Sequence, residues 1–344
     1  MKTLLCVFLL LSIALGAFSL DYAADVEPAF EQFAQDMAST LPFNASIGLG
    51  WSDAYIGQFP RFGVGVTVGA TTIPFESVKT VLDAFSITLP AQFRYVEQYG
   101  FPVPAYTLDA RIGGFGIPFD IGVKVGYVPP DMMQKMGLPL SLNYLLAGAD
   151  IRFALLKDKG FVPALSLGAG YTFMKGSLSV PGLMSGDVVI GNFRVPDGLG
   201  GFTPHTLSLT NPSLNLSWDT NVIEVKAELS KTLLIFTPYM GAGALFAVGS
   251  HAGGGVQSSL LLDTFPATQP RIDGIIQAFT AAGQTPPDLS TAGIIVQKAA
   301  PVGWAGRLFG GVSMNLLVLR LDLGALYSFP GGSFGGSANL RFQL

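Results

Sequence analysis

Long runs in which apolar and polar residues alternate constrain this chain more than any other feature of its sequence. In the clearest run, Ile121, Val123 and Val125 alternate with glycine and lysine, and similar runs cover residues 149–155 and 317–327. Successive side chains of a β-strand point to opposite faces, so each run predicts a strand with one apolar and one charged face. Several runs reach the length, about nine residues or more, that a tilted strand needs to cross a bilayer.

Composition favours a lipid-facing surface over a water-soluble one. Charged residues make up 12% of the chain, whereas a typical soluble domain has about 25%. After residue 19, only residues 232–249 approach the apolar length of a membrane helix, and they contain Pro238. Because only helices and closed barrels satisfy every backbone polar group within lipid, we predict an all-β fold, a transmembrane antiparallel β-barrel. A water-soluble β-sandwich would also alternate and is the alternative fold.

Counting the alternating runs predicts a barrel of about fourteen strands, with twelve as the alternative. The expected strands are residues 43–51, 62–71, 86–96, 105–115, 119–128, 142–156, 161–180, 205–218, 221–230, 233–249, 252–263, 300–313, 316–328 and 333–344. An even number places both ends of the barrel on the periplasmic side, where short turns such as residues 157–160 and 219–220 are expected. The long segments expected on the outer side are residues 129–141, 181–204 and 264–299.

The first residues have the pattern of a cleaved secretory signal, with an uncleaved anchor helix as the alternative. Lys2 supplies a positive start, residues 4–15 are apolar, and small residues precede a cut before Leu20. The only cysteine, Cys6, lies in this segment, so the exported chain would have neither disulfides nor thiolate metal sites. The expected divisions are a signal peptide at 1–19, a helical segment at 20–42 and the barrel at 43–344.

An amphipathic helix is predicted before the first strand. Asp25 can cap it, Pro28 suits its first turn, and Phe30, Phe33 and Met37 recur on one face. Such a helix could fill the barrel as a plug, lie on the membrane surface, or pack against a partner. We favour the plug, with these three apolar side chains as plug residues.

No recognisable catalytic or metal-binding pattern accompanies the strands. The two histidines, His205 and His251, lack a partner at ligand spacing, so we expect no metal, no cofactor and no enzyme activity. The net charge of −4 argues against nucleic acid as a partner. Charges of both signs on the non-lipid faces predict structural ion pairs rather than a strongly ion-selective pore. These residues are Asp109, Arg111, Lys124, Asp150, Arg152, Glu224, Lys226, Glu228, Arg320, Asp322 and Arg341.

The long outer segments are unusually apolar. Exposed apolar surface usually marks a binding site, and methionine-rich surfaces suit varied apolar ligands. We therefore predict that hydrophobic small molecules bind among these segments, with a ligand-free lid as the alternative. The predicted ligand-binding residues are Met133, Met136, Ile190, Phe193, Ile276 and Phe279.

These features together resemble the FadL-type outer-membrane transporters of long-chain fatty acids. The shared features are the signal peptide, an N-terminal segment that could plug the barrel, about fourteen strands and apolar outer segments. The resemblance implies uptake of hydrophobic small molecules, with long-chain fatty acids the leading substrate, across a bacterial outer membrane. The chain lacks the family's Asn-Pro-Ala start and is shorter, so its ligand residues cannot be transferred. The alternatives are a general diffusion porin or small-solute channel, and a surface barrel without transport.

The third expected strand contains Pro90, which cannot donate a ladder hydrogen bond. In the FadL-type family a kinked third strand opens a lateral path to the bilayer, so the resemblance implies a lateral exit at Pro90. A simple bulge without an opening is the alternative.

The last expected strand keeps its alternation to the terminus. Leu340, Phe342 and Leu344 share one face, a pattern that resembles the signal read by the barrel-assembly machinery, although the usual final residue is phenylalanine. The expected partners are therefore that machinery and outer-membrane lipid, beside the hydrophobic ligand.

Overall fold

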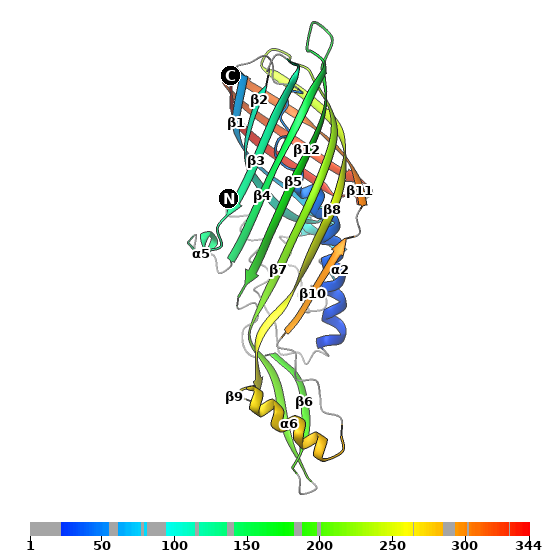
Figure 1. The fold of residues 1–344 in the computed structure, drawn as a ribbon, viewed down its shortest axis with the longest axis vertical. Helices are drawn as coiled ribbons and strands as arrows, with labels where there is room; N and C mark the ends of the chain where they lie inside the picture. Colours follow the sequence, from blue (N-terminus) through cyan, green and yellow to red (C-terminus); the bar gives the residue numbers. More distant parts are fainter. Residues whose placement is uncertain are drawn as a thin grey trace.

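The structure is a computed structural model that describes residues 22–54, 61–76, 79–80, 94–113, 117–135, 141–181, 188–197, 201–263, 265–284, 293–300, 303–329 and 331–344. Within these residues, thirteen strands form one sheet, and every pairing is antiparallel. The sheet curls into a barrel with a long extension at one end (Figure 1). The predicted all-β barrel is confirmed.

The elements alternate between long strands and a few helices. The strands are β1 (Arg61–Ile73), β2 (Phe101–Gly113), β3 (Phe119–Val128), β4 (Ser141–Leu156), β5 (Ala164–Val180), β6 (Val188–Pro196), β7 (Phe202–Ser230), β8 (Phe236–Leu262), β9 (Phe265–Pro266), β10 (Gly293–Ala300), β11 (Gly303–Leu316), β12 (Leu319–Phe329) and β13 (Phe334–Gln343). The helices are α2 (Tyr22–Ala45), α4 (Arg94–Tyr99), α5 (Met132–Lys135) and α6 (Gln269–Ala281). None of the described helices combines the length and apolar character needed to span a membrane.

Ten strands close the barrel, rather than fourteen or twelve. They follow one another in the order β1-β2-β3-β4-β5-β7-β8-β11-β12-β13, and β13 pairs with β1 again. The other three, β6, β9 and β10, pair only with parts of β7 and β8. The expected count is too high because two expected pairs of strands are single long strands, and two further expected strands do not belong to the wall.

β7 and β8 are each longer than expected. The expected turn at 219–220 is wrong, because Asp219 and Thr220 pair with His251 and Ser250 inside the β7–β8 ladder. These polar residues lie beyond Ile223 on β7, which is among the exposed apolar side chains of the wall. β7 and β8 continue beyond the apolar belt, so the polar residues at this point do not mark the ends of the strands.

Two expected strands are absent from the wall. Residues 43–51 end α2 and then cross the barrel interior, where all side chains from 43 to 49 are buried. Among the described residues, no strand lies between β1 and β2, where residues 86–96 were expected, because β1 pairs directly with β2 along its whole length. Residues 94–96 belong to α4, and Pro90 lies outside the described residues.

The outer face of the wall is an apolar belt between two rows of aromatic residues. In β1 and β3, exposed and buried residues alternate, and the exposed ones are mostly valine, isoleucine and leucine. One aromatic row contains Phe62, Phe153, Phe236 and Phe342, and the other contains Tyr127, Tyr171, Trp304 and Phe334, all at least one-third exposed. Transmembrane barrels have an apolar band of this kind between aromatic girdles.

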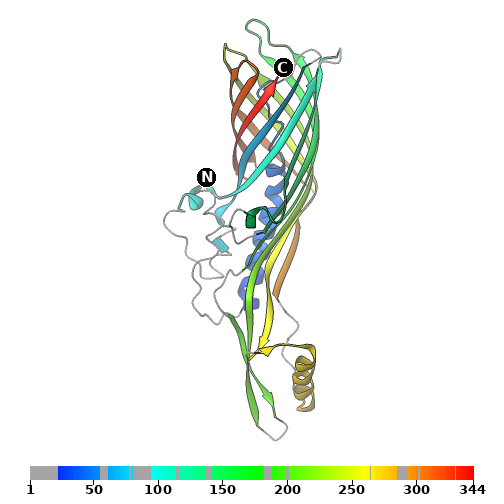
Figure 2. The same ribbon diagram turned by 90° about the vertical axis from the view of Figure 1, so that its left-hand side faces the viewer.

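The two ends of the barrel differ. One end, the short-turn end, carries the connections 157–163, 231–235 and 317–318 and the final residue, Leu344. The other, the extended end, carries the distal parts of β7 and β8 with β6, β9, β10 and α6 (Figures 1 and 2). Residues 231–232 were expected as an outer turn, but Lys231 forms an ion pair with Asp158 of the neighbouring short turn. The connections at 157–160 and 231–232 therefore share one end of the barrel, although they were expected on opposite sides.

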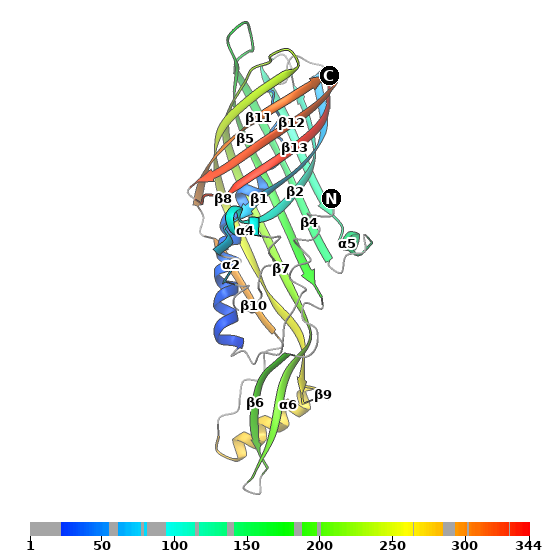
Figure 3. The same ribbon diagram turned by 180° about the vertical axis from the view of Figure 1, so that it is seen from behind.

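α2 lies along the inner side of the extension and ends within the barrel. Its main neighbours are β8 and β10, and its last turns also reach β1 and β2 (Figures 1 and 3). The helix therefore points its C-terminal end into the lumen.

Candidate functional site

The residues that follow α2 fill the barrel interior. We call residues 46–54 the lumen segment. Lys124, on the inner face of β3, is 6% exposed, and its Nζ donates to the carbonyl oxygens of Ala45 and Ile47, both at 2.7 Å. This lysine supplies hydrogen-bond donors to two backbone carbonyls that are buried in the barrel. The start of the lumen segment is thus held by the wall.

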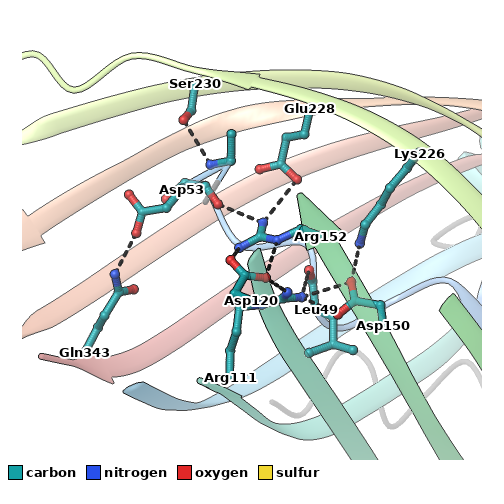
Figure 4. Close-up of polar contacts among 12 residues, drawn as sticks. Leu49, Asp53, Arg111, Asp120, Asp150, Arg152, Lys226, Glu228, Ser230 and Gln343 are labelled. Atoms are coloured by element: carbon teal, nitrogen blue, oxygen red, sulfur yellow. Dashed lines mark hydrogen bonds and ion pairs between the residues drawn. The ribbon is translucent and has the colours of Figure 1, made fainter. Parts of the chain in front are cut away.

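Asp53 fixes the other end of the lumen segment. Its carboxylate accepts hydrogen bonds from Arg320 at 2.6 Å, from Gln343 at 2.8 Å and from Arg341 at 3.3 Å. Its backbone carbonyl accepts one from Arg152 at 2.7 Å (Figure 4). Charge-assisted bonds of this kind are stronger than neutral ones, so Asp53 is the main anchor at the short-turn end.

Trp51 completes the filling of the lumen. It is fully buried, and the guanidinium carbons of Arg341 and Arg111 lie 4.7 Å and 5.7 Å from its ring centroid. A Cβ at Gly63 of β1 would come within 2.7 Å of the indole, so the wall needs glycine there. The ring therefore packs between cations and directly against the backbone of β1.

The wall itself is held by a network of ion pairs. Arg111 binds both carboxylate oxygens of Asp150, at 2.7 and 2.9 Å, and also contacts Asp120. Arg152 binds the other side of Asp120 at 2.9 Å, and Lys226 binds Asp150 at 2.9 Å (Figure 4). Buried charges are tolerated when they are paired and hydrogen-bonded in this way.

The charges in the lumen balance only when the lumen segment is present. The described inner wall carries the cations Arg111, Lys124, Arg152, Lys226, Arg307, Arg320 and Arg341 and the carboxylates Asp109, Asp120, Asp150, Glu224, Glu228 and Asp322. Asp53 supplies one further negative charge. The structure thus has the mixed-sign ion pairs predicted for the inner faces, and the lumen segment completes them.

An apolar pocket lies where α2 meets the extended end of the barrel. Phe33 and Met37 of α2 form one side, and residues of six barrel strands form the other. The wall side consists of Ile73, Pro102, Val103, Pro104, Tyr106, Val128, Leu142, Tyr144, Leu178, Leu216 and Trp218. The cavity has a volume of about 90 Å³, and none of these residues carries a charge. The arrangement suits an uncharged apolar group.

Beside this pocket, the ladder between β2 and β3 is interrupted. β2 pairs with β3 only from Leu108 to Gly113, although β2 begins at Phe101 and β3 continues to Val128. Over the same stretch β2 pairs fully with β1, and β3 with β4. Pro102 and Pro104 lie in the part of β2 that pairs with β1 but not with β3, and neither can donate a ladder hydrogen bond.

Tyr106 lies at this interruption. Its neighbours two and six residues on, Leu108 and Ile112, face outward and are exposed, yet Tyr106 is half-buried. Its ring centroid is 5.6 Å from that of Tyr144, which is on the inner face of β4. The Tyr106 ring therefore helps to close the side of the pocket where β2 and β3 do not pair.

The far end of the extension forms a small core of its own, which we call the tip: β6, β9, α6 and the adjoining ends of β7 and β8. Its buried residues are Val195, Leu207, Leu262, Ile275 and Phe279, with Phe193 packed against them. Asp263 accepts hydrogen bonds from the Thr206 N–H and pairs with His205 Nδ1, both at 2.9 Å. α6 contributes Ile275 and Phe279 to this core.

The structure brings together only part of the predicted ligand site. Phe193 and Phe279 meet in the tip, but Ile276 is 36% exposed on α6. Ile190 is in β6 and Met133 in α5, with side chains outside the described residues, as is all of Met136. α5 packs beside β4, away from the tip (Figures 1 and 3). Among the described side chains, Phe193 and Phe279 thus share the tip core, and one pocket formed by all six residues stays a prediction.

The predicted plug residues also have a different place. Phe33 and Met37 line the pocket at the extended end, and the side chain of Phe30 is outside the described residues. The lumen is filled instead by residues 46–54, which were expected to form part of the first strand and the turn after it. Trp51, Asp53, Tyr144 and Trp218 were not singled out, because their alternation or polarity alone does not distinguish them from ordinary wall or loop residues.

Comparison with known proteins adds little to this geometry. No protein-family model and no curated protein matches the chain. The outer membrane protease OmpT from Escherichia coli aligns with 9% identity and a TM-score of 0.37, over 83% of this chain and 97% of that chain. The translocator domain of the autotransporter NalP from Neisseria meningitidis aligns with 9% identity and a TM-score of 0.30, over 93% of this chain and 99% of that chain. The Ralstonia pickettii toluene transporter TbuX aligns with 9% identity and a TM-score of 0.26, over 84% of this chain and 89% of that chain. Likenesses this weak carry no argument about function.

Proposed function

We propose that this chain is an outer-membrane protein that binds hydrophobic small molecules and takes part in their uptake. The observation that carries the proposal is the uncharged apolar pocket between α2 and the extended end of the barrel. Burial of a ligand's apolar surface drives such binding, at about 0.8 kcal/mol per buried CH₂ group. The apolar belt and the aromatic girdles of the wall support the membrane location.

The filled lumen argues against a general diffusion porin. A porin needs a water-filled path, whereas the lumen segment and the paired charges around it occupy the interior of this barrel. A hydrophobic ligand would instead reach or leave the pocket sideways, past Tyr106, where β2 and β3 do not pair. The lateral path that was expected at Pro90 would thus lie at Pro102 and Pro104.

The size and chemistry of the pocket limit what it can hold. A cavity of about 150 Å³ is large enough for benzene, and this one measures about 90 Å³, so a long acyl chain would fill it with only part of its length. With no charged residue in the lining, a carboxylate would have to stay at the mouth, in water. Long-chain fatty acids remain the leading substrate class, and uncharged hydrocarbons should bind at least as well.

The test uses Trp218 as a reporter, since bromine atoms quench a tryptophan that they touch. A Trp304→Phe background removes the 70% exposed indole that detergent-dissolved probes would reach. We expect saturable quenching by an ω-brominated fatty acid and by the bromoalkane of equal chain length. Adding Met37→Asp should abolish it, because a carboxylate would then sit in the pocket, whereas Ser39→Asp, at an exposed site on the same helix, should not.

The contradicting result is equally specific. Quenching that does not saturate, or that persists at the same strength when Trp218→Phe is added, would mean that the probes only partition into detergent. The pocket would then not be a ligand site, and a surface barrel without transport would be the better description.

A further inference from the structure

We propose that this barrel carries its own N-terminal end through the membrane and displays it on the outer side. The inference rests on the outer-membrane location proposed above and adds the direction in which the chain crosses the lumen. It concerns the start of α2, to which neither the pocket nor the ligand assigns a role.

The direction of the chain follows from the contacts of the lumen segment. The Tyr22 end of α2 lies in the extension, beside β8 and β10 (Figures 1 and 3). The lumen segment begins beside Lys124 of the wall and continues to Asp53. Asp53 binds Gln343, the last residue of β13. Ala54 donates to Ser230, which ends β7 at a short turn. The chain therefore enters at the extended end and leaves at the short-turn end.

The first strand begins where the lumen segment ends. Arg61 of β1 pairs with Gly113 of β2, next to the short connection between β2 and β3, and Gly63 pairs with Gln343. In outer-membrane barrels the short turns face the periplasm and the long segments face outward. With that assignment, the start of α2 lies outside the cell.

The contacts make this arrangement a stable state rather than a transient one. Withdrawal of the lumen segment together with the end of α2 would remove both carbonyl acceptors, Ala45 and Ile47, from the buried Nζ of Lys124. It would also remove the carboxylate of Asp53 from Arg320. Breaking a buried ion pair by removing one partner is strongly destabilising. An exported chain arrives in the periplasm, so the N-terminal segment must pass within its own barrel, or be enclosed when β1 and β13 pair, to reach this position.

The experiment places an epitope tag between Asp21 and Tyr22 of the full chain. Matched tags at Gly160, in a short turn, and at Gln284, after α6, mark the two sides. Antibody binding is compared on intact and permeabilised cells, and heat-dependent gel mobility checks that each barrel is folded. We expect the N-terminal tag to behave like the Gln284 tag, with full binding on intact cells.

A tag-free version guards against disturbance by the inserted peptide. Gln32 is exposed on α2 and Lys159 is exposed in a short turn, and the chain has no cysteine after Cys6. A membrane-impermeant maleimide should label Gln32→Cys on intact cells and leave Lys159→Cys unlabelled.

The outcomes separate this inference from the proposed function. If Gln284 is accessible on intact cells but the N-terminal tag and Gln32→Cys are not, the display is wrong while the outer-membrane assignment stands. If Gly160 and Lys159→Cys are the accessible sites, the assignment of sides fails and the display fails with it.

Discussion

Two buried lysines on the inner wall have different kinds of partner. Lys124 donates to one carbonyl oxygen at the end of α2 and one in the lumen segment, whereas Lys226 binds Asp150 of the wall. Both are at most 6% exposed and both belong to barrel strands, so they form a matched pair. Only the first connects the wall to the lumen segment through a hydrogen bond.

We expect Lys124→Met to loosen the lumen segment and Lys226→Met to leave it in place. Gly50 is a suitable reporter position, because a Cβ there would meet no atom within 4 Å. In a Gly50→Cys background, a charged thiol reagent should label Lys124→Met several-fold faster than the parent, and Lys226→Met at the parental rate. Equal acceleration by both substitutions would show general loosening of the barrel instead.

In the tip, neighbouring apolar residues of α6 should differ sharply in their effect on stability. Phe279 is 8% exposed in the tip core, so Phe279→Ala should cost this core about 3–5 kcal/mol. Ile276 is 36% exposed, so Ile276→Ala should cost about 0.5 kcal/mol. Limited proteolysis in denaturant measures both, and similar losses for the two would contradict the tip core described above.

At the scale of elements, the alternation of side chains identifies most wall strands from sequence. β3, β4, β12 and β13 lie close to the expected ranges, because one face meets lipid and the other meets paired charges. The same pattern fails for residues 43–51, because the lumen buries both faces of that segment. It also cannot show where β7 and β8 leave the membrane and continue, or that the candidate site joins Met37 to residues far along the chain.

The interrupted ladder between β2 and β3 should control how fast a ligand reaches the pocket. Replacing Pro102 and Pro104 with valine supplies two N–H groups and favours strand pairing. We expect slower quenching of Trp218 by the bromoalkane, with the same final amplitude. Pro238→Val, in β8 at the short-turn end, is the matched control and should not change the rate. An unchanged rate in the double variant would refute the lateral route.

The tip should become less stable in acid. The N–H of Thr206, then His205 and the charge of Arg271, hold the pKa of Asp263 below its ordinary value of 3.8. A carboxyl with a lowered pKa stabilises the folded state above the ordinary value and loses that effect as the pH falls through the lowered one. Proteolysis of the tip should therefore accelerate below about pH 4, and Asp263→Asn should weaken this pH dependence. An identical pH profile for the variant would exclude this carboxyl as the cause.

The whole molecule is a ten-stranded barrel whose lumen is filled by its own N-terminal chain. The wall has one more cation than carboxylate among its described inner residues, and Asp53 of the lumen segment supplies the missing charge. α2, which precedes the lumen segment, forms one side of the apolar pocket. Closure of the lumen and formation of the apolar pocket are therefore consequences of one segment.

Planar-bilayer recording tests this claim most directly, by comparing the wild-type protein with a variant that lacks residues 22–54. The wild-type barrel should conduct little or no current, because the lumen segment fills it. The variant, if its heat-dependent gel mobility shows a folded barrel, should form a steady aqueous channel. A wild-type protein that conducts steadily, or a folded variant whose conductance equals that of the wild type, would contradict the account.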